Sequence, residues 1–312
     1  MPSETLGPQI IDHFVGAKPI VDRVKVALEA AWNIGNGCVF PHSLLVGPGG
    51  LGKTELARII SREMGVELFE ILGKSVHTTA DLNAALLQAE GGCLLIDEAH
   101  SLSNDMQVSL LKVLQEGMIF LRAARNAGAV ATMSLKPFCL LAATTDEWAL
   151  TRPLVDRFRL ILRLDFYTTD EMAQLITRRA RSSGVALEDG VASCIAQRSK
   201  GTPRIGIRLL ESCVRTMQAE NGNAISVAVF ERTCQLDQID SLGLDPVEQR
   251  YLQLLNDAGG ILRVNVIASC LGLPRATLER AIEPYLIRER LIEKAESGRC
   301  LTLRGTEHLA GE

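Results

Sequence analysis

The sequence predicts a mixed α/β fold: a parallel sheet flanked by helices, then an all-α domain, then a small domain of helices and a two-stranded ribbon. Three observations predict it. Short apolar runs alternate with helical patterns over the first half of the chain, as in parallel sheets. Residues 168–238 are helical in pattern almost throughout. Beyond residue 241, two helical segments around a glycine precede two strand-like runs. We therefore predict domains at 1–167, 168–238 and 239–312.

Composition limits the classes of function that the chain can have. Its 312 residues suit two or three domains, and 47% apolar with 22% charged residues is typical of a soluble globular protein. No apolar run approaches the ~18 residues of a membrane-spanning helix, and the N-terminus lacks a signal pattern. Eight scattered cysteines without a Cys-x-x-Cys pair indicate a reducing compartment, so we expect a cytoplasmic protein. A net charge of −4 argues against broad coating of nucleic acid, so a DNA site must be local or absent.

A glycine-rich stretch after the first buried run has the pattern of a phosphate-binding P-loop. An apolar run at 43–46 precedes it and a helical pattern follows, so its backbone N–H groups and the helix N-terminus would cradle phosphate oxygens. We expect Lys53 to reach the β- and γ-phosphates and Thr54 to bind Mg²⁺. A glycine-rich turn with a chance Lys-Thr is the alternative, which the flanking strand and helix disfavour. The predicted nucleotide-binding residues are Gly47, Pro48, Gly49, Gly50, Leu51, Gly52, Lys53 and Thr54.

Two further buried runs end in polar residues that suit hydrolysis. The run 93–96 ends in Asp97 and Glu98, about 40 residues after the P-loop, which is the Walker B arrangement. Asp97 would hold Mg²⁺ and Glu98 would act as general base for water. The run 138–143 ends in Thr144 and Thr145, one of which could orient water. Taken alone, acids or threonines there simply mark a strand meeting solvent.

The remaining elements follow from apolar periodicity and capping signals. A helix capped by Thr79 is expected to Glu90, and residues 168–171 cap the first helix of the all-α region. We also expect helices at 19–32 and 104–116, strands at 67–72 and 160–164, a protruding hairpin at 118–135 with Asn126-Ala127-Gly128 in its middle, and a loop at 199–203 before a helix beginning at Pro203.

The last seventy residues have the pattern of a winged helix, a common DNA-binding module. Helices are expected at 247–256, 264–271 and 275–287, the last kinked at Pro284, and strands at 291–293 and 300–303. Residues 251–312 hold eight basic and eight acidic residues, so the domain is not globally basic. A winged helix used for protein contacts therefore remains an alternative.

In these motifs the chain resembles the RuvB family, bacterial AAA+ motors that drive branch migration of Holliday junctions. The resemblance covers nearly the whole length in order. It rests on residues 47–54, 96–100, 143–145, 153–158, 166–167, 201–205, 208–210 and 283–287.

The resemblance implies an α/β P-loop AAA+ core, an all-α lid and a C-terminal winged helix. It implies ATP and Mg²⁺ as ligands, DNA (a four-way junction or duplex) as substrate, and a homo-oligomer in the form of a hexameric ring, with a RuvA-like partner left open. By position, Thr145 or Thr144 is the first sensor, Arg157 the arginine finger for the neighbour's ATP, and Arg204 the second sensor. The other implied sites are Val15 and Tyr167 beside the adenine, Glu55 in the nucleotide site, and Lys294 and Arg299 at the DNA.

The sequence departs from the family pattern at several positions. The hairpin region 117–135, which docks RuvA in the family, matches poorly. Single-residue departures are Gly7, Ala17, Glu55, Asp146, Val155 and Lys294. A AAA+ ATPase that remodels a protein or clamp-like partner is the alternative function. A DNA-binding regulator with ATP as a switch is disfavoured, because a switch needs neither Glu98 nor Arg157.

Overall fold

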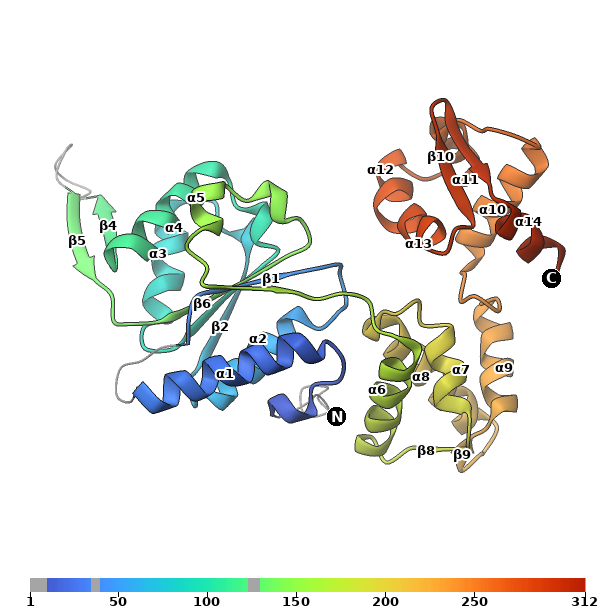
Figure 1. Cartoon of the computed structure of the whole chain (residues 1–312), viewed down its shortest axis with the longest axis horizontal. Helices are drawn as coiled ribbons and strands as arrows, with labels where there is room; N and C mark the ends of the chain where they lie inside the picture. The colour runs from blue at the N-terminus through green and yellow to red at the C-terminus, as the bar shows by residue number, and fades with distance from the viewer. Residues whose placement is uncertain (1–9, 35–39, 123–129, 312) are drawn as a thin grey trace. The chain divides into compact units, whose positions relative to one another are not determined.

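A computed structural model describes residues 10–34, 40–122 and 130–311 of the chain (Figure 1). The chain divides into two compact units. The first comprises Met1–Ser183 with Gly201–Ile205, and the second Gly184–Lys200 with Gly206–Glu312. None of the described helices is long and apolar enough to cross a membrane.

The first unit is built on a five-stranded parallel sheet, which confirms the predicted fold class. The strand order is β2-β3-β6-β1-β7, and each neighbouring pair is parallel. The central strands are apolar without alternation because both of their faces are covered. The strands are β1 (Ser43–Val46), β2 (Leu68–Leu72), β3 (Cys93–Asp97), β6 (Cys139–Thr144) and β7 (Leu160–Arg163).

Helices cover both faces of this sheet (Figure 1). Successive strand residues point to opposite faces, so Leu44 packs in one apolar core and Leu45 in the other. On one face lie α1 (Lys18–Ile34) and α2 (Lys53–Glu63), and on the other α3 (Thr79–Gln88), α4 (Asn104–Glu116) and α5 (Arg152–Val155). The short turns η2 (Ile11–His13), η3 (Gly73–Ser75), η4 (Ala99–Ser101) and η5 (Glu147–Ala149), and the helix α6 (Thr169–Ser182), complete the unit.

The hairpin and the cap of α3 in this unit can be compared with the predictions. The hairpin is present as antiparallel β4 (Met118–Arg122) and β5 (Val130–Ser134), while the predicted middle at 126–128 lies outside the described residues. The predicted cap of α3 is wrong by one residue. Thr78 caps it, because Thr78 Oγ1 accepts from the N–H of Asp81 and Asp81 Oδ2 accepts from the N–H of Thr78.

The second unit begins with a helical bundle. Its helices are α7 (Val191–Gln197), most of α8 (Pro203–Ala219) and α9 (Val227–Asp237), joined by the two-residue parallel strands β8 (Ala186–Leu187) and β9 (Ala224–Ile225). The helix α8 begins at Pro203 as predicted, where the missing N–H of proline costs no hydrogen bond.

The winged helix follows in the same unit, around an apolar core that includes Tyr251 and Leu286. The kink expected at Pro284 is a π-helical stretch just before it, since a proline cannot donate the next helical hydrogen bond. Leu303 was predicted in a strand but begins a helix capped by Thr302. The elements are α10 (Pro246–Ala258), α11 (Val264–Leu271), α12 (Arg275–Thr277), η6 (Leu278–Ile282), α13 (Glu283–Arg288), β10 (Ile292–Ala295), β11 (Gly298–Leu301) and α14 (Leu303–Ala310).

Candidate nucleotide site and DNA interface

The loop between β1 and α2 forms a cradle that only glycine can line. Gly47 has φ 148°, and a Cβ there would lie 2.4 Å from the carbonyl oxygen of Leu164. Gly50 and Gly52 also have positive φ, and Gly52 precedes the first turn of α2. The N–H groups of a helix's first turn have no partner within the helix, so the start of α2 favours an anion at this place.

Lys53 is the first residue of α2 and is buried within the cradle. Its ammonium donates to the carbonyl oxygens of Gly47 (2.6 Å) and Pro48 (2.9 Å). Burial lowers the pKa of Lys53 from its usual value, and the nearby Arg204 adds to this, while the acids at the end of β3 oppose it. A phosphate would replace two neutral carbonyls as the partner of this cation and stabilise its charged form.

Asp97 lies at the carboxyl end of β3 and meets the P-loop helix. Its Oδ2 accepts from the hydroxyl of Thr54 at 3.2 Å, and its Oδ1 accepts from the N–H of Glu98 at 2.9 Å. Residues 43 positions apart in the sequence therefore place a hydroxyl and a carboxylate side by side. Oxygen donors of these two kinds are what Mg²⁺ prefers.

Glu98 adopts a left-handed backbone conformation with φ 52°, which is costly for a residue with a side chain. Gly73 packs against its carbonyl group, since a Cβ on Gly73 would lie 2.5 Å from that oxygen. Glu98 Oε2 accepts from the hydroxyl of Thr145 and lies 3.3 Å from His100 Nε2. These contacts fix the carboxylate at the edge of the sheet where the P-loop also ends.

The structure distinguishes the two threonines that end β6. Thr144 is buried, and its hydroxyl contacts Asp146 and His100 Nδ1. Thr145 is exposed and faces Glu98. Thr145 is thus the threonine that can reach a substrate. Sequence reasoning missed the role of His100, although its place two residues after Glu98 was a usable signal.

Buried apolar side chains flank the cradle. Phe14, Val15 and Tyr167 are buried, a Cβ on Gly16 would lie 2.7 Å from the ring of Tyr167, and a Cβ on Gly52 would touch the ring of Phe14 at 3.4 Å. The N–H of Arg204 donates to the carbonyl of Gly50, and Glu55, in the first turn of α2, pairs with Arg58. Arg204 therefore lies beside the loop, and the binding of nucleotide by Val15, Tyr167 and Arg204 stays a prediction.

Arg157 lies at the other edge of the sheet. It precedes β7, which runs parallel to β1 with Leu160 beside Ser43, whereas the P-loop follows the far end of β1. Four strand residues span about 13 Å, so the guanidinium does not reach this chain's own cradle. Arg157 is exposed and lines a cavity of about 630 Å³ with residues that precede strands, among them His42 and Phe138.

The two predicted DNA-binding residues face each other across the β10–β11 ribbon. The Lys294 side chain is 54% exposed, and its ammonium lies 3.9 Å from Glu283. The Arg299 side chain is only 11% exposed, and its Nε and Nη2 donate to the two carboxylate oxygens of the fully buried Glu283. The hydroxyl of Tyr251 donates to the same carboxylate. Lys294 is available to a phosphate, whereas Arg299 is engaged inside the domain, and DNA contact by either residue stays a prediction.

Comparisons with known proteins agree over the whole chain. Family models match in order: the Holliday junction DNA helicase RuvB P-loop domain at 6–164, the RuvB AAA lid domain at 167–240 and the RuvB C-terminal winged helix domain at 241–310. The Holliday junction branch migration complex subunits RuvB of Rubrobacter xylanophilus and Kosmotoga olearia are each 35% identical. The alignments cover 98% of this chain and 86% and 90% of theirs.

Solved structures show the same similarity. The Holliday junction branch migration motor RuvB of Thermotoga maritima superposes with a TM-score of 0.84 at 32% identity, over 98% of each chain. A mutant of that protein gives 0.85 at 33% identity, over 97% of this chain and 98% of its own.

Proposed function

The chain belongs to the RuvB family, and we propose that it is an ATP-driven motor that moves Holliday junctions, with each hydrolysis site shared by two neighbouring subunits of a ring. One observation carries this proposal. Lys53, Thr54, Asp97, Glu98 and Thr145 converge at one edge of the sheet, while Arg157 is presented at the opposite edge.

The residues at the first edge bind and orient the nucleotide. The loop N–H groups and Lys53 hold the phosphates, with the ammonium exchanging its two loop carbonyls for phosphate oxygens. Thr54 and Asp97 fit Mg²⁺, which when bound neutralises charge on the phosphates. The buried side chains of Val15 and Tyr167 lie against the base.

Glu98 is the general base in this proposal. Its carboxylate accepts a hydrogen bond from the attacking water, and the contacts to Thr145 and His100 keep it aimed at that water. Such a positioned base contributes about 10²- to 10⁴-fold to the rate. Arg204, beside the P-loop at Gly50, senses the terminal phosphate.

Arg157 completes the site of the next subunit. A cation placed on the transferring phosphoryl group contributes about 10³- to 10⁵-fold when it is supplied across an interface. Because Arg157 stands at the edge away from its own P-loop, only a neighbour's nucleotide is within its reach. We propose a hexamer for the ring, DNA contact through Lys294, a RuvA-like partner on the β4–β5 hairpin, and a cytoplasmic location.

A mixing experiment tests the shared site. Glu98→Gln and Arg157→Ala should each lower ATP turnover by at least about 10²-fold. Equal mixtures of the two variants should regain activity, since a Glu98-intact site can meet a neighbour with an intact Arg157. A cis role for Arg157 predicts mixtures as inactive as the separate variants.

The motor itself is tested with DNA. Turnover of the wild type should rise on adding linear duplex and four-way junction, and junction-dependent strand movement should accompany it. An ATP turnover rate that neither DNA changes would contradict a DNA motor and favour a protein-remodelling ATPase.

A further inference from the structure

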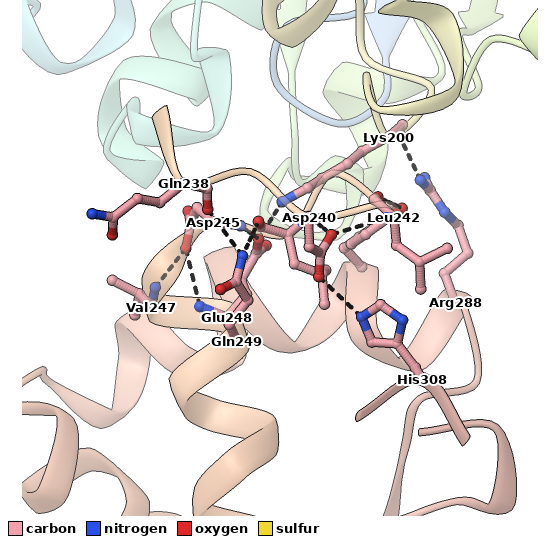
Figure 2. Close-up of polar contacts among 12 residues, drawn as sticks. Lys200, Gln238, Asp240, Leu242, Asp245, Val247, Glu248, Gln249, Arg288 and His308 are labelled. Carbon is pink, nitrogen blue, oxygen red and sulfur yellow. Dashed lines mark hydrogen bonds and ion pairs between the residues drawn. The ribbon is translucent and has the colours of Figure 1, made fainter. Parts of the chain in front are cut away.

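Lys200 is joined to the winged helix through both its side chain and its main chain. Its ammonium pairs with Glu248 of α10, and its carbonyl oxygen accepts from Arg288 of α13 at 2.6 Å (Figure 2). Lys200 lies in the loop after α7, so one residue of the helical bundle contacts two helices of the next domain.

The Lys200–Glu248 pair is almost fully excluded from water. The two side chains are 11% and 6% exposed, and the ammonium also lies 4.9 Å from the centre of the Tyr285 ring. Burial raises the pKa of Glu248 even though the charge of Lys200 lowers it. A buried ion pair of this kind adds little stability over an apolar pair of the same shape, but it fixes one relative orientation.

Glu248 is itself held in place. Its Oε2 accepts from the N–H of Asp245 at 2.9 Å, and Asp245 Oδ1 accepts from the N–H of Glu248, so the pair caps α10. A second polar tie joins the linker after α9 to the last helix. His308 of α14 contacts Asp240, whose other oxygen accepts from two linker N–H groups (Figure 2). These hydrogen bonds hold Glu248 and the neighbouring linker in place, so Glu248 cannot move away from Lys200 without breaking them.

The backbone at Lys200 is in a costly conformation. Lys200 has φ 54° and Gly201 has φ 65°, two left-handed residues in succession. For a residue with a Cβ this conformation is unfavourable, so the surrounding contacts must maintain it. The chain passes here from the second unit to the first, in which the carbonyl of Gly201 accepts from the N–H of Tyr167. Three residues further on is Arg204, which donates to the P-loop.

We propose that Lys200 is a positioning residue that couples the winged helix to the nucleotide site. DNA bound on the winged helix shifts α10 and α13, and Lys200 passes this shift to the segment Gly201–Arg204. By linkage, the nucleotide state changes the affinity for DNA by the same factor as DNA changes the affinity for nucleotide. This inference rests on the function proposed above.

The test uses the full chain with Lys200→Met, and Arg304→Met as matched control. Arg304 pairs with Glu289 within the winged helix at 3.0 Å and is half exposed. Four quantities are measured: turnover without DNA, its stimulation by duplex DNA, DNA affinity with ADP and with a non-hydrolysable ATP analogue, and thermal unfolding. Lys200→Met should keep basal turnover within about twofold but lose about fivefold or more of the stimulation, and its two DNA affinities should converge. Arg304→Met should behave as wild type.

Further variants separate coupling from a structural role. Lys200→Arg keeps the charge and should retain most of the stimulation, and Lys200→Glu with Glu248→Lys should recover part of what each single change loses. Full stimulation in Lys200→Met would overturn the inference, as would loss of DNA binding in every nucleotide state with a lower unfolding temperature. A wild type that DNA does not stimulate would instead refute the proposed function.

Discussion

Two cations predicted to meet phosphates, Lys53 in the P-loop and Arg299 in the winged helix, lie in opposite surroundings. Lys53 donates to two neutral backbone carbonyls, and its burial leaves the cation in need of an anion. Arg299 already has one, since the buried carboxylate of Glu283 takes two of its donors. A basic residue that matches a phosphate-binding position of its family is therefore a candidate for that role only when no carboxylate of its own domain already pairs with it.

Replacing Lys53 gives the largest expected effect on activity. Lys53→Ala should lower ATP turnover by about 10²-fold or more, because the cation on the phosphates is lost. Its unfolding temperature should not fall, since the variant no longer buries a cation that hydrogen-bonds to two neutral carbonyls. Turnover assays and thermal melts check this. A marked loss of stability would mean that Lys53 is structural, as Arg299 is.

Breaking the Glu283 network gives the next largest effect, on stability. Glu283→Gln should lower the free energy of unfolding by about 3 kcal/mol, since it removes the nearer and fully buried counter-ion of the Arg299 guanidinium and leaves it Glu279 at 3.5 Å. Glu289→Gln, which breaks the half-exposed pair with Arg304, should cost less than about 1 kcal/mol. Denaturant titration of both variants measures the difference. Equal losses would contradict the structural role given to Arg299.

The smallest expected effect is the acid sensitivity that His42 gives the first unit. Its Nδ1 accepts from the N–H of Leu140, and burial, with Arg159 nearby, lowers the pKa of His42 below its usual 6.5. The unfolded chain then binds the proton more readily, so this contribution is complete above pH 6.5 and is lost as pH falls through the lower folded value.

His42→Asn keeps a side-chain acceptor but does not titrate. Its unfolding temperature should therefore fall less than that of the wild type between about pH 7.5 and about pH 5. Parallel curves of unfolding temperature against pH for the two proteins would show that other groups cause the loss of stability in acid.

The parallel sheet and the glycine loop after β1 were predictable because local rules determine them. Fully apolar strands, glycines with positive φ and polar residues at strand ends each leave a signal in adjacent positions. The structure then showed what no local rule gives, namely which of Thr144 and Thr145 faces Glu98, and that His100 supports it.

In the winged helix, local signals were less informative. Arg299 and Glu283 are 16 residues apart, and nothing in either neighbourhood indicates that they pair. The helix α14 was missed because the β11 pattern runs into it without a break until Thr302 caps it. The prediction that Arg299 contacts DNA came from the resemblance to the family. Only the packed structure could show that Glu283 competes with DNA for this guanidinium. The boundaries 1–167, 168–238 and 239–312 stay predictions.

Separate edges for Arg157 and the P-loop also determine how activity should scale with assembly. If the hydrolysis site is shared as proposed, a lone subunit would bind nucleotide without a finger, and an open row of subunits would always have one terminal site without a donor. Only closure of the proposed ring would supply every site, so turnover per subunit should rise steeply with protein concentration and then level off. Dilution alone should thus switch off the ATPase of an intact protein, so that a free subunit would not consume ATP.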